Sequence, residues 1–487
     1  MQRVNAGSPA ARLPEAASSA HQHDSLIGTA MHGPLIRTAL PGPRSQALLA
    51  RQSERESNAR SYPRRIPVAI RRGRGPFVED EDGNVFIDFL SGAGVLALGH
   101  SHPELVAAVQ RQAAEFTHGL DFPTRAKDEF TTKLLDLFPA DMRATSRIHF
   151  CGPTGANAIE AAIKLCKKAT GGGDVVAFDG GFHGMTHGAL AVSGERALRA
   201  DMANVMPGVR FFPFAYCHRC PLGLRPQSCD TNCAGYLERA LSDSHSGIGK
   251  PAAVLLELVQ GEGGTVAAPA EFVRRVREVT TRLDIPLIVD EVQTGCGRTG
   301  RWFAFEHYAI KPDVVVLSKM LSGIGTPAAV IVYHERLDRW QPGSHTGTFR
   351  GNQLAFAAGS AFIDIVARDR VLANVGDRSR QASDRLEQVR RRSGGLISDV
   401  RCFGLMVGAE FSKPGTGEPW GEAASAVQRE AFQRGLILEI GGRHDCVVRM
   451  LPPLNITDAI LDTALTIFEQ AVDAASVALA AELGGAA

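Results

Sequence analysis

Four short, unbroken apolar runs constrain the fold of this chain more than any other feature of its sequence. They are rich in Val, Leu and Ile and occupy residues 174–180, 252–259, 285–292 and 313–319. Amphipathic stretches with helical spacing, such as residues 269–283, lie between several of the runs. Apolar strands that alternate with helices predict an α/β fold with a mostly parallel central sheet and helices on both of its faces.

The distribution of turns and helical patterns adds a smaller α+β domain to this large one. A hairpin is predicted at Asp82-Gly83, where an Asp-Gly turn lies between two apolar stretches. We expect four segments: an N-terminal tail or partly ordered arm at 1–60, the first part of the small domain at 61–125, the large domain at 126–375, and the rest of the small domain at 376–487.

Composition excludes several classes of partner. The chain has 487 residues, with 53 Lys plus Arg and 52 Asp plus Glu, so it has no basic surplus for nucleic acid or an anionic membrane. Its longest apolar runs are far shorter than the roughly 20 residues needed to cross a bilayer. The N-terminal stretch contains no apolar signal segment, and nine cysteines, an odd number, favour a reducing compartment. We therefore expect a cytoplasmic protein.

Polar side chains gather where the predicted strands end, at Gln260, Glu262, Asp290, Glu291, Gln293, Ser318 and Lys319. Each alone is compatible with a solvated strand end, but ligands of open parallel sheets bind at the carboxyl ends of the strands. Lys319 is the most informative, because a buried ammonium is costly unless it reacts or finds a partner. A lysine with an aspartate fits pyridoxal phosphate, whose aldehyde binds the amine and whose ring nitrogen pairs with the carboxylate.

Residues 288–319, IVDEVQTGCGRTGRWFAFEHYAIKPDVVVLSK, resemble the class III aminotransferases (the ω-aminotransferases), which have the fold type I architecture of pyridoxal-phosphate enzymes. The resemblance extends over residues 65–475 and leaves out the N-terminal tail. It implies a pyridoxal-phosphate-dependent aminotransferase with the large and small domains expected above.

The resemblance also implies roles for individual residues. Lys319 matches the lysine that holds the cofactor covalently and then carries the proton, Asp290 the partner of the pyridinium nitrogen, and Gln293 a group near the phenolic oxygen. The other implied cofactor-binding residues are Gly155 and Ala156, whose backbone amides bind the phosphate, Phe182, which stacks on the ring, His183 beside it, and Thr348, which reaches the phosphate of the neighbouring subunit. The match at Thr348 implies a homodimer with shared active sites.

Two positions depart from the family's phosphate loop. Many members have Ser or Thr where this chain has Ala156, and Glu where it has Asn157. One hydroxyl contact to the phosphate is therefore missing, whereas the backbone amides that bind the phosphate are retained.

Glu262 and Arg449 match a pair of residues that acts as a substrate switch in the family. The arginine receives the α-carboxylate of glutamate, and the glutamate neutralises the arginine when an ω-amine without that carboxylate enters. An ordinary surface ion pair is the alternative interpretation.

Within the family, residues 150–165 (FCGPTGANAIEAAIKL) and 347–352 (GTFRGN) resemble the diaminobutyrate–2-oxoglutarate transaminase branch. This implies transfer of the amino group of L-glutamate to L-aspartate 4-semialdehyde, giving L-2,4-diaminobutyrate and 2-oxoglutarate. Three alternatives stay open: amination of another aldehyde in a natural-product pathway, racemisation or epimerisation of an amino acid, and a non-catalytic binding module. The presence of Lys319, Asp290 and Gln293 disfavours the last.

A cysteine-rich run has C-x2-C-x8-C-x3-C spacing and contains Cys217, Cys220, Cys229 and Cys233. Four thiols in one short run could bind zinc or an iron–sulfur cluster. Cysteine-rich loops also occur at this point in ω-aminotransferases without a metal. A structural loop with free or paired thiols is therefore the preferred interpretation, and no metal ligand is assigned.

Overall fold

The computed structural model describes residues 31–202 and 204–484. Residues 1–30 of the predicted arm lie outside the described residues. In the rest of the arm, helix α1 (Pro43–Arg55) begins with a proline in its first turn, and Leu35 forms an antiparallel bridge with Val85. This part of the arm is thus attached to the hairpin that follows it in the sequence.

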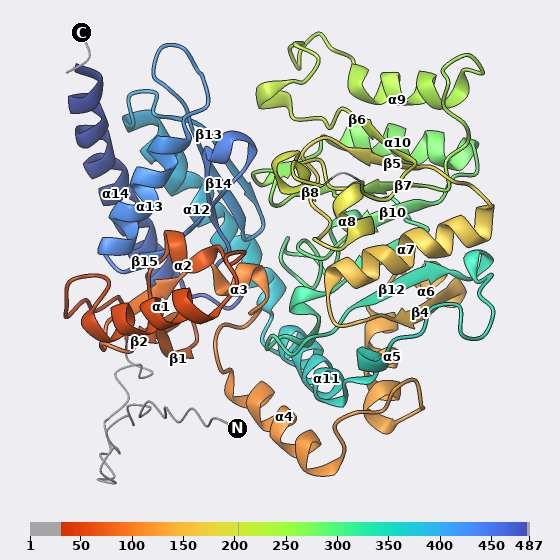
Figure 1. The fold of residues 1–487 in the computed structure, drawn as a ribbon, viewed down its shortest axis with the longest axis horizontal. Helices are drawn as coiled ribbons and strands as arrows, with labels where there is room; N and C mark the ends of the chain where they lie inside the picture. The colour runs from red at the N-terminus through yellow and green to blue at the C-terminus, as the bar shows by residue number, and fades with distance from the viewer. Residues whose placement is uncertain (1–30, 203, 485–487) are drawn as a thin grey trace, which may run out of the picture.

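A seven-stranded sheet forms the centre of the large part of the molecule (Figure 1). Its strands, in spatial order, are β4 (Ser146–Phe150), β12 (Val330–His334), β11 (Val314–Leu317), β10 (Leu287–Asp290), β7 (Ala253–Leu256), β5 (Val175–Phe178) and β6 (Val209–Phe212). β12 runs antiparallel to both of its neighbours, and the pairs from β11 to β6 are parallel. The four predicted apolar strands are therefore confirmed as β5, β7, β10 and β11.

Helices cover both faces of this sheet. Successive side chains of a strand point to opposite faces, so two neighbouring residues report on the two sides. Val175 belongs to the buried cluster that contains the apolar side chains of α7 (Gly155–Thr170). Its neighbour Val176 belongs to the main cluster, together with the apolar side chains of α10 (Ala270–Arg282). The sequence prediction of a sheet buried on both sides is confirmed.

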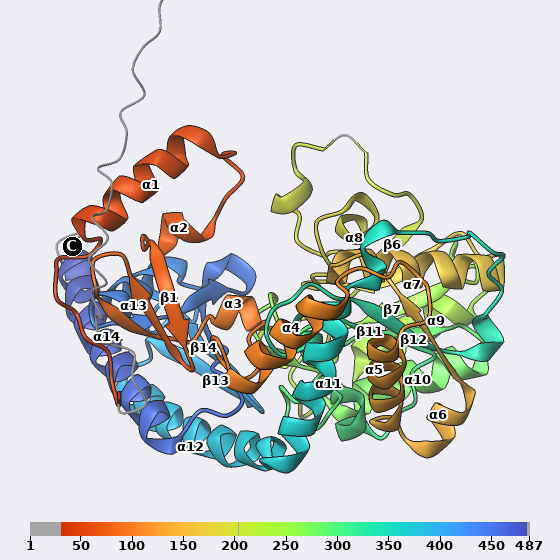
Figure 2. The ribbon, with the colours of Figure 1, turned by 90° about the horizontal axis from the view of Figure 1, so that it is seen from below.

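A smaller α+β part contains two four-stranded sheets, ordered β1-β2-β3-β15 and β13-β14-β17-β16 (Figures 1 and 2). β2 (Phe77–Asp80) and β3 (Val85–Asp88) pair antiparallel, which confirms the predicted hairpin at Asp82-Gly83. The other strands are β1 (Ile70–Arg74), β13 (Ile397–Phe403), β14 (Met406–Phe411), β15 (Leu436–Ile437), β16 (Glu439–Gly441) and β17 (Val447–Met450), and β8 (Val259–Gln260) and β9 (Val266–Ala267) form a separate pair.

The other helices are α2 (Tyr62–Arg65), α3 (Ser91–Gly94), α4 (Pro103–Glu115), α5 (Arg125–Asp136), α6 (Ala140–Thr145), α8 (His187–Ala191), α9 (Asn232–Ser242), α11 (Gln353–Arg368), α12 (Val371–Arg392), α13 (Gly421–Gln433) and α14 (Asp458–Gly484). Helix α12 runs across the predicted limit at residue 375. The division into four segments stays a prediction. Among the described residues, none of the helices combines the length and apolar character that crossing a bilayer requires.

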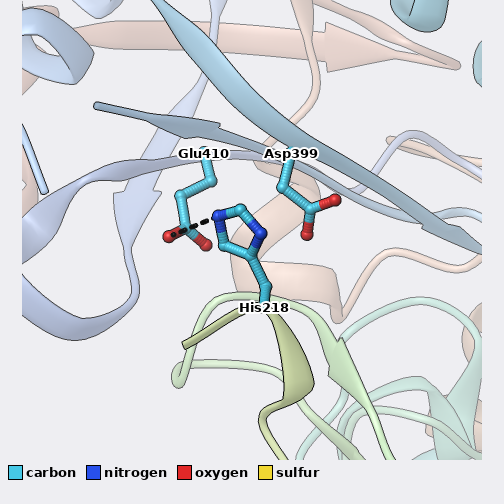
Figure 3. A group of neighbouring side chains, drawn as sticks. All are labelled: His218, Asp399 and Glu410. Carbon is cyan, nitrogen blue, oxygen red and sulfur yellow. Dashed lines mark ion pairs between the residues drawn. The ribbon is translucent and has the colours of Figure 1, made fainter. Parts of the chain in front are cut away.

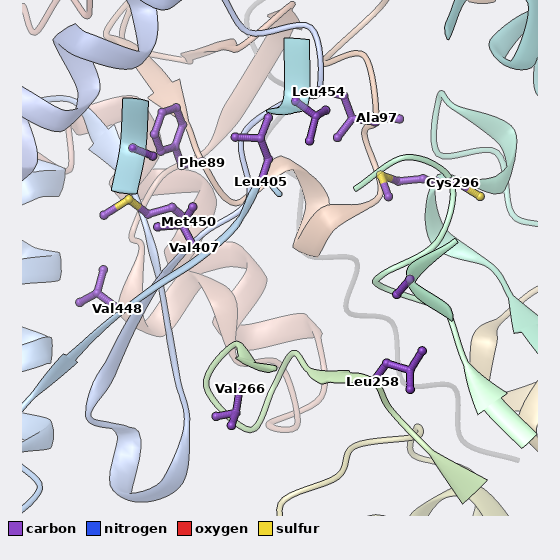
Figure 4. Packing of buried hydrophobic residues seen from close by; sticks show 14 of the residues in the cluster. Phe89, Ala97, Leu258, Val266, Cys296, Leu405, Val407, Val448, Met450 and Leu454 are labelled. Carbon is purple, nitrogen blue, oxygen red and sulfur yellow. The ribbon is translucent and has the colours of Figure 1, made fainter. Parts of the chain in front are cut away.

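One apolar cluster joins the two parts of the molecule (Figure 4). Leu258 and Cys296, which come from the large part, belong to the same buried cluster as Phe89, Leu405 and Met450 from the smaller part. Burial of such side chains contributes roughly 1.5–3 kcal/mol each, so the contact stabilises one relative placement of the two parts. That placement is needed for a site built from both.

Candidate active site

A cavity of about 630 Å³ lies at the carboxyl ends of β10 and β11 and at the start of α7. Its volume is in the range of small-molecule and cofactor sites. Eight of the ten predicted site residues line it: Gly155, Ala156, Phe182, His183, Glu262, Asp290, Gln293 and Lys319. The structure thus brings together side chains from widely separated parts of the sequence.

Lys319 lies two residues after the end of β11 and begins the short 3₁₀ helix η4 (Lys319–Ser322). Its φ of 44° is in the left-handed region that non-glycine residues rarely adopt, and such strain is concentrated at functional sites. Burial lowers the pKa of the Lys319 amine, and this effect outweighs the opposing charges of Glu262, Glu439 and Asp290. The side chain keeps some accessible surface because it faces the cavity. The fold therefore favours a neutral amine in the cavity.

Asp290 ends β10 and is held by a histidine. His183 Nδ1 and Asp290 Oδ2 are 2.7 Å apart, and both side chains are buried. Burial lowers the pKa of His183, but the hydrogen bond and the charge of Asp290 outweigh it and raise the pKa. His183 is thus suited to keep its proton and to hold a negatively charged Asp290 in one orientation.

Glu257 is a buried residue of the site that the sequence reasoning missed. Its carboxylate accepts hydrogen bonds from the backbone amides of Phe182 (2.9 Å) and Gly261 (3.3 Å). Burial raises its pKa to about 7. Its position one residue after β7 is the signal that could have identified it, because the run 252–259 is otherwise apolar.

The start of α7 faces the cavity with its backbone. Thr154 caps the helix and forms a capping box with Asn157, in which each side chain bonds the other residue's backbone. Residue 155 is a glycine because a side chain would not fit there: a Cβ atom would lie only 2.9 Å from Val292 Cγ1. A helix start with free amide groups binds phosphate groups well. The departure from the family pattern at Asn157 thus has a structural role.

Arg449, on β17, lies fully buried between two carboxylates. It forms a bidentate pair with Glu262 (3.0 and 2.6 Å), and its Nη2 is also 3.0 Å from Glu439 Oε2. Burial alone would raise the pKa of Glu262, but Arg449 lowers it below its usual value. The pair is therefore a charged, closed contact at the cavity wall and not a surface ion pair.

Thr348 is the predicted residue that the structure leaves away from this cavity. It begins the 3₁₀ helix η6 (Thr348–Gly351), is exposed, and its carbonyl accepts a hydrogen bond of 2.8 Å from His118 Nε2. Its predicted contact with the phosphate of a neighbouring subunit stays a prediction.

The cysteine-rich run contains free thiols at all four positions, Cys217, Cys220, Cys229 and Cys233. Within residues 31–202 and 204–484, they do not form a group close enough to share a metal ion. A group that meets this spacing is His218, Asp399 and Glu410 (Figure 3). Arg401 pairs with both of its carboxylates, at 2.6 and 2.7 Å, so the group is an ion-pair network that joins the cysteine-rich run to β13 and β14.

The sequence matches the aminotransferase class-III family over residues 58–472. It is 48% identical to the diaminobutyrate–2-oxoglutarate aminotransferase of Rhizobium meliloti (strain 1021), over 85% of this chain and 90% of that protein. It is 44% identical to the enzyme of the same name from Haemophilus influenzae, over 88% of this chain and 95% of that protein. Among solved structures, an ornithine aminotransferase from Toxoplasma gondii superposes with a TM-score of 0.75 at 26% identity, covering 88% of this chain and 94% of that one. This chain belongs to the class III aminotransferases.

Proposed function

We propose that this protein is a pyridoxal-phosphate-dependent aminotransferase that moves the amino group of L-glutamate to L-aspartate 4-semialdehyde, giving L-2,4-diaminobutyrate and 2-oxoglutarate. The names of two relatives that match most of the chain support the substrates. The single observation that carries the proposal is the closed Glu262–Arg449 pair at the wall of the cavity that contains Lys319.

The residues of the cavity fit the cofactor. An amine at Lys319, a carboxylate at Asp290 and a helix start at Gly155 match the aldehyde, the ring nitrogen and the phosphate of pyridoxal phosphate. Gln293 lines the same cavity, and its Oε1 is buried without a hydrogen-bond partner among the described residues, so this amide is available to a ligand. The cofactor, when bound, supplies the aldehyde that accepts an amino group and a ring that takes up electrons.

The chain's own groups then have separate tasks. Lys319, whose pKa is lowered by burial, could take a proton from the carbon that bears the amino group and return it to the carbon that was the cofactor's aldehyde. Asp290, held by His183, would pair with the ring nitrogen of the bound cofactor. The backbone amides at the start of α7 would hold its phosphate.

Substrate exchange uses the Glu262–Arg449 pair. The α-carboxylate of glutamate takes the place of Glu262 on Arg449, because a bidentate arginine–carboxylate pair can be exchanged for an equivalent one. When a terminal amine reacts, no carboxylate is next to the reacting carbon and Glu262 returns to Arg449. One site can thus accept both substrates in turn.

Half-reaction spectroscopy tests this function. Glutamate added to the purified holoenzyme is expected to convert the absorbance of the cofactor from its aldehyde form to its amine form, and aspartate 4-semialdehyde to reverse the change. Borohydride reduction and digestion are expected to place the label on Lys319. No conversion by glutamate, or a label on another residue, contradicts the proposal. If glutamate converts the cofactor but aspartate 4-semialdehyde does not reverse the change, a panel of other aldehydes identifies the substrate that does, and the assigned substrate is wrong.

We also propose a homodimer in the cytoplasm. Apolar side chains are exposed around Thr348: Phe349 is 69% and Phe122 is 67% accessible, and Phe349 packs edge-on against His118. An exposed aromatic group of this kind is typical of an interface. A partner seated there would cover it and could bring its Thr348 to the cavity of the first subunit. The nine free cysteines support a reducing compartment.

A further inference from the structure

A second glutamate beside Arg449 has no part in the exchange described above. Glu439 lies on β16, directly opposite Arg449 in the antiparallel pair with β17. Glu262, in contrast, lies in the turn between β8 and β9. The strand pairing therefore fixes Glu439 next to Arg449, whereas Glu262 reaches Arg449 from a turn outside this sheet.

The charges of this group do not balance. Arg449 carries one positive charge and contacts two carboxylates, at 2.6 Å to Glu262 and 3.0 Å to Glu439. With both carboxylates ionised, the closed group has one surplus negative charge. Charges that are buried without compensation are costly, so burial favours the neutral form of Glu439 in the closed group, whereas a cation bound beside it would favour the charged form.

The Glu439 carboxylate also lacks hydrogen-bond donors. Its side chain is 9% accessible, and Oε2 has no hydrogen-bond partner among the described residues, although it is near Arg449 Nη2. Oε1 accepts one long hydrogen bond, 3.5 Å, from Tyr62 Oη. Burial raises the pKa of Glu439, and the charge of Arg449 opposes the rise. Glu262, which shares Arg449 with Glu439, lines the cavity that contains Lys319.

We propose that Glu439 recognises the second ammonium group of a diamino acid that reacts through its terminal amine. The inference rests on the proposed function and extends it to a specificity-determining residue. 2,4-Diaminobutyrate carries an α-ammonium that 4-aminobutyrate lacks, and the two are otherwise the same molecule. With Glu262 closed on Arg449, an ammonium bound beside Glu439 would compensate its carboxylate, and Tyr62 lies next to Glu439 as a second polar contact.

The test compares the two amines on the holoenzyme and on the variants Glu439→Gln and Glu439→Asp. The quantity measured is the ratio of kcat/KM for 2,4-diaminobutyrate to that for 4-aminobutyrate, from half-reactions followed by cofactor absorbance. We expect Glu439→Gln to lower this ratio at least tenfold, mainly through KM for the diamine, and Glu439→Asp to lower it less because the charge is kept. Tyr62→Phe is expected to lower it by a smaller factor.

A purely structural role of Glu439 would weaken both amines alike, so a ratio within threefold of the wild-type value in Glu439→Gln overturns the inference. Failure of the proposed function is recognised separately: in that case glutamate does not convert the cofactor of the wild-type enzyme. If glutamate reacts but the wild type does not prefer 2,4-diaminobutyrate over 4-aminobutyrate, the inference alone is wrong. Should Glu439→Gln not fold, the same criterion applies to Glu439→Asp and Tyr62→Phe.

Discussion

Glu291 is a buried carboxyl that the proposed chemistry does not use. It follows Asp290 but lies outside the cavity, where it accepts hydrogen bonds from the Phe305 amide (3.0 Å) and the Thr294 hydroxyl. Burial raises its pKa to about 7, from 4.5. An acid whose pKa is raised in the folded state binds a proton on folding, so its contribution to stability falls as the pH rises from about 4.5 to 7.

The variant Glu291→Gln is therefore expected to be more stable relative to wild type at pH 8 than at pH 5, by about 2 kcal/mol, since each pKa unit corresponds to about 1.4 kcal/mol. Glutamine retains an acceptor for Phe305 and a partner for Thr294. Urea denaturation at both pH values measures the difference. Glu54→Gln, at an exposed position of α1, is the control, since it makes the same substitution without removing a buried carboxyl. An equal effect of Glu291→Gln at both pH values contradicts the prediction.

At the scale of elements, the start of α7 combines stability with cofactor binding. Thr154 caps this helix at the cavity, and Thr124 caps α5 at a position outside the cavity. Replacing either threonine by alanine removes one capping hydrogen bond, which costs about 1 kcal/mol. The two helices thus offer a matched comparison of a cap that faces the cofactor with one that does not.

Thr154→Ala and Thr124→Ala are expected to lose similar amounts of stability in denaturant titrations of the apoenzyme. Only Thr154→Ala is expected to weaken pyridoxal phosphate retention severalfold, measured by equilibrium dialysis, because its amides would no longer be held in place for the phosphate. If both variants retain the cofactor alike, the start of α7 is not the phosphate site.

At the scale of the whole molecule, the exposed group at Phe122 and Phe349 predicts the assembly. Phe349→Asp is expected to shift the protein from dimer to monomer in analytical ultracentrifugation and to reduce activity, because an aspartate at a packed interface would be left without solvent. Val477→Asp is the control, since Val477 is 74% accessible on α14. A Phe349→Asp variant that stays dimeric, or a wild-type monomer of full activity, would exclude this interface.

Whether an element was predictable depends on whether its signal is local in the sequence. Strands β5, β7, β10 and β11 and helix α10 follow from apolar periodicity, which is a local property of the sequence. The antiparallel direction of β12 does not, because an apolar run gives no direction relative to its neighbours. Helix α1 was likewise not anticipated within the predicted arm.

The sequence alone determined that this is an α/β chain with an aspartate and a lysine at the ends of two successive strands, since strand patterns and motif spacing are properties of short stretches of sequence. Only the tertiary structure decided the charge balance of the cavity. Glu262 and Arg449 are 187 positions apart, and their contact with Glu439 depends on the pairing of β16 with β17. Burial and pairing energies of charged groups are set by the groups that surround them in space, which no local pattern encodes.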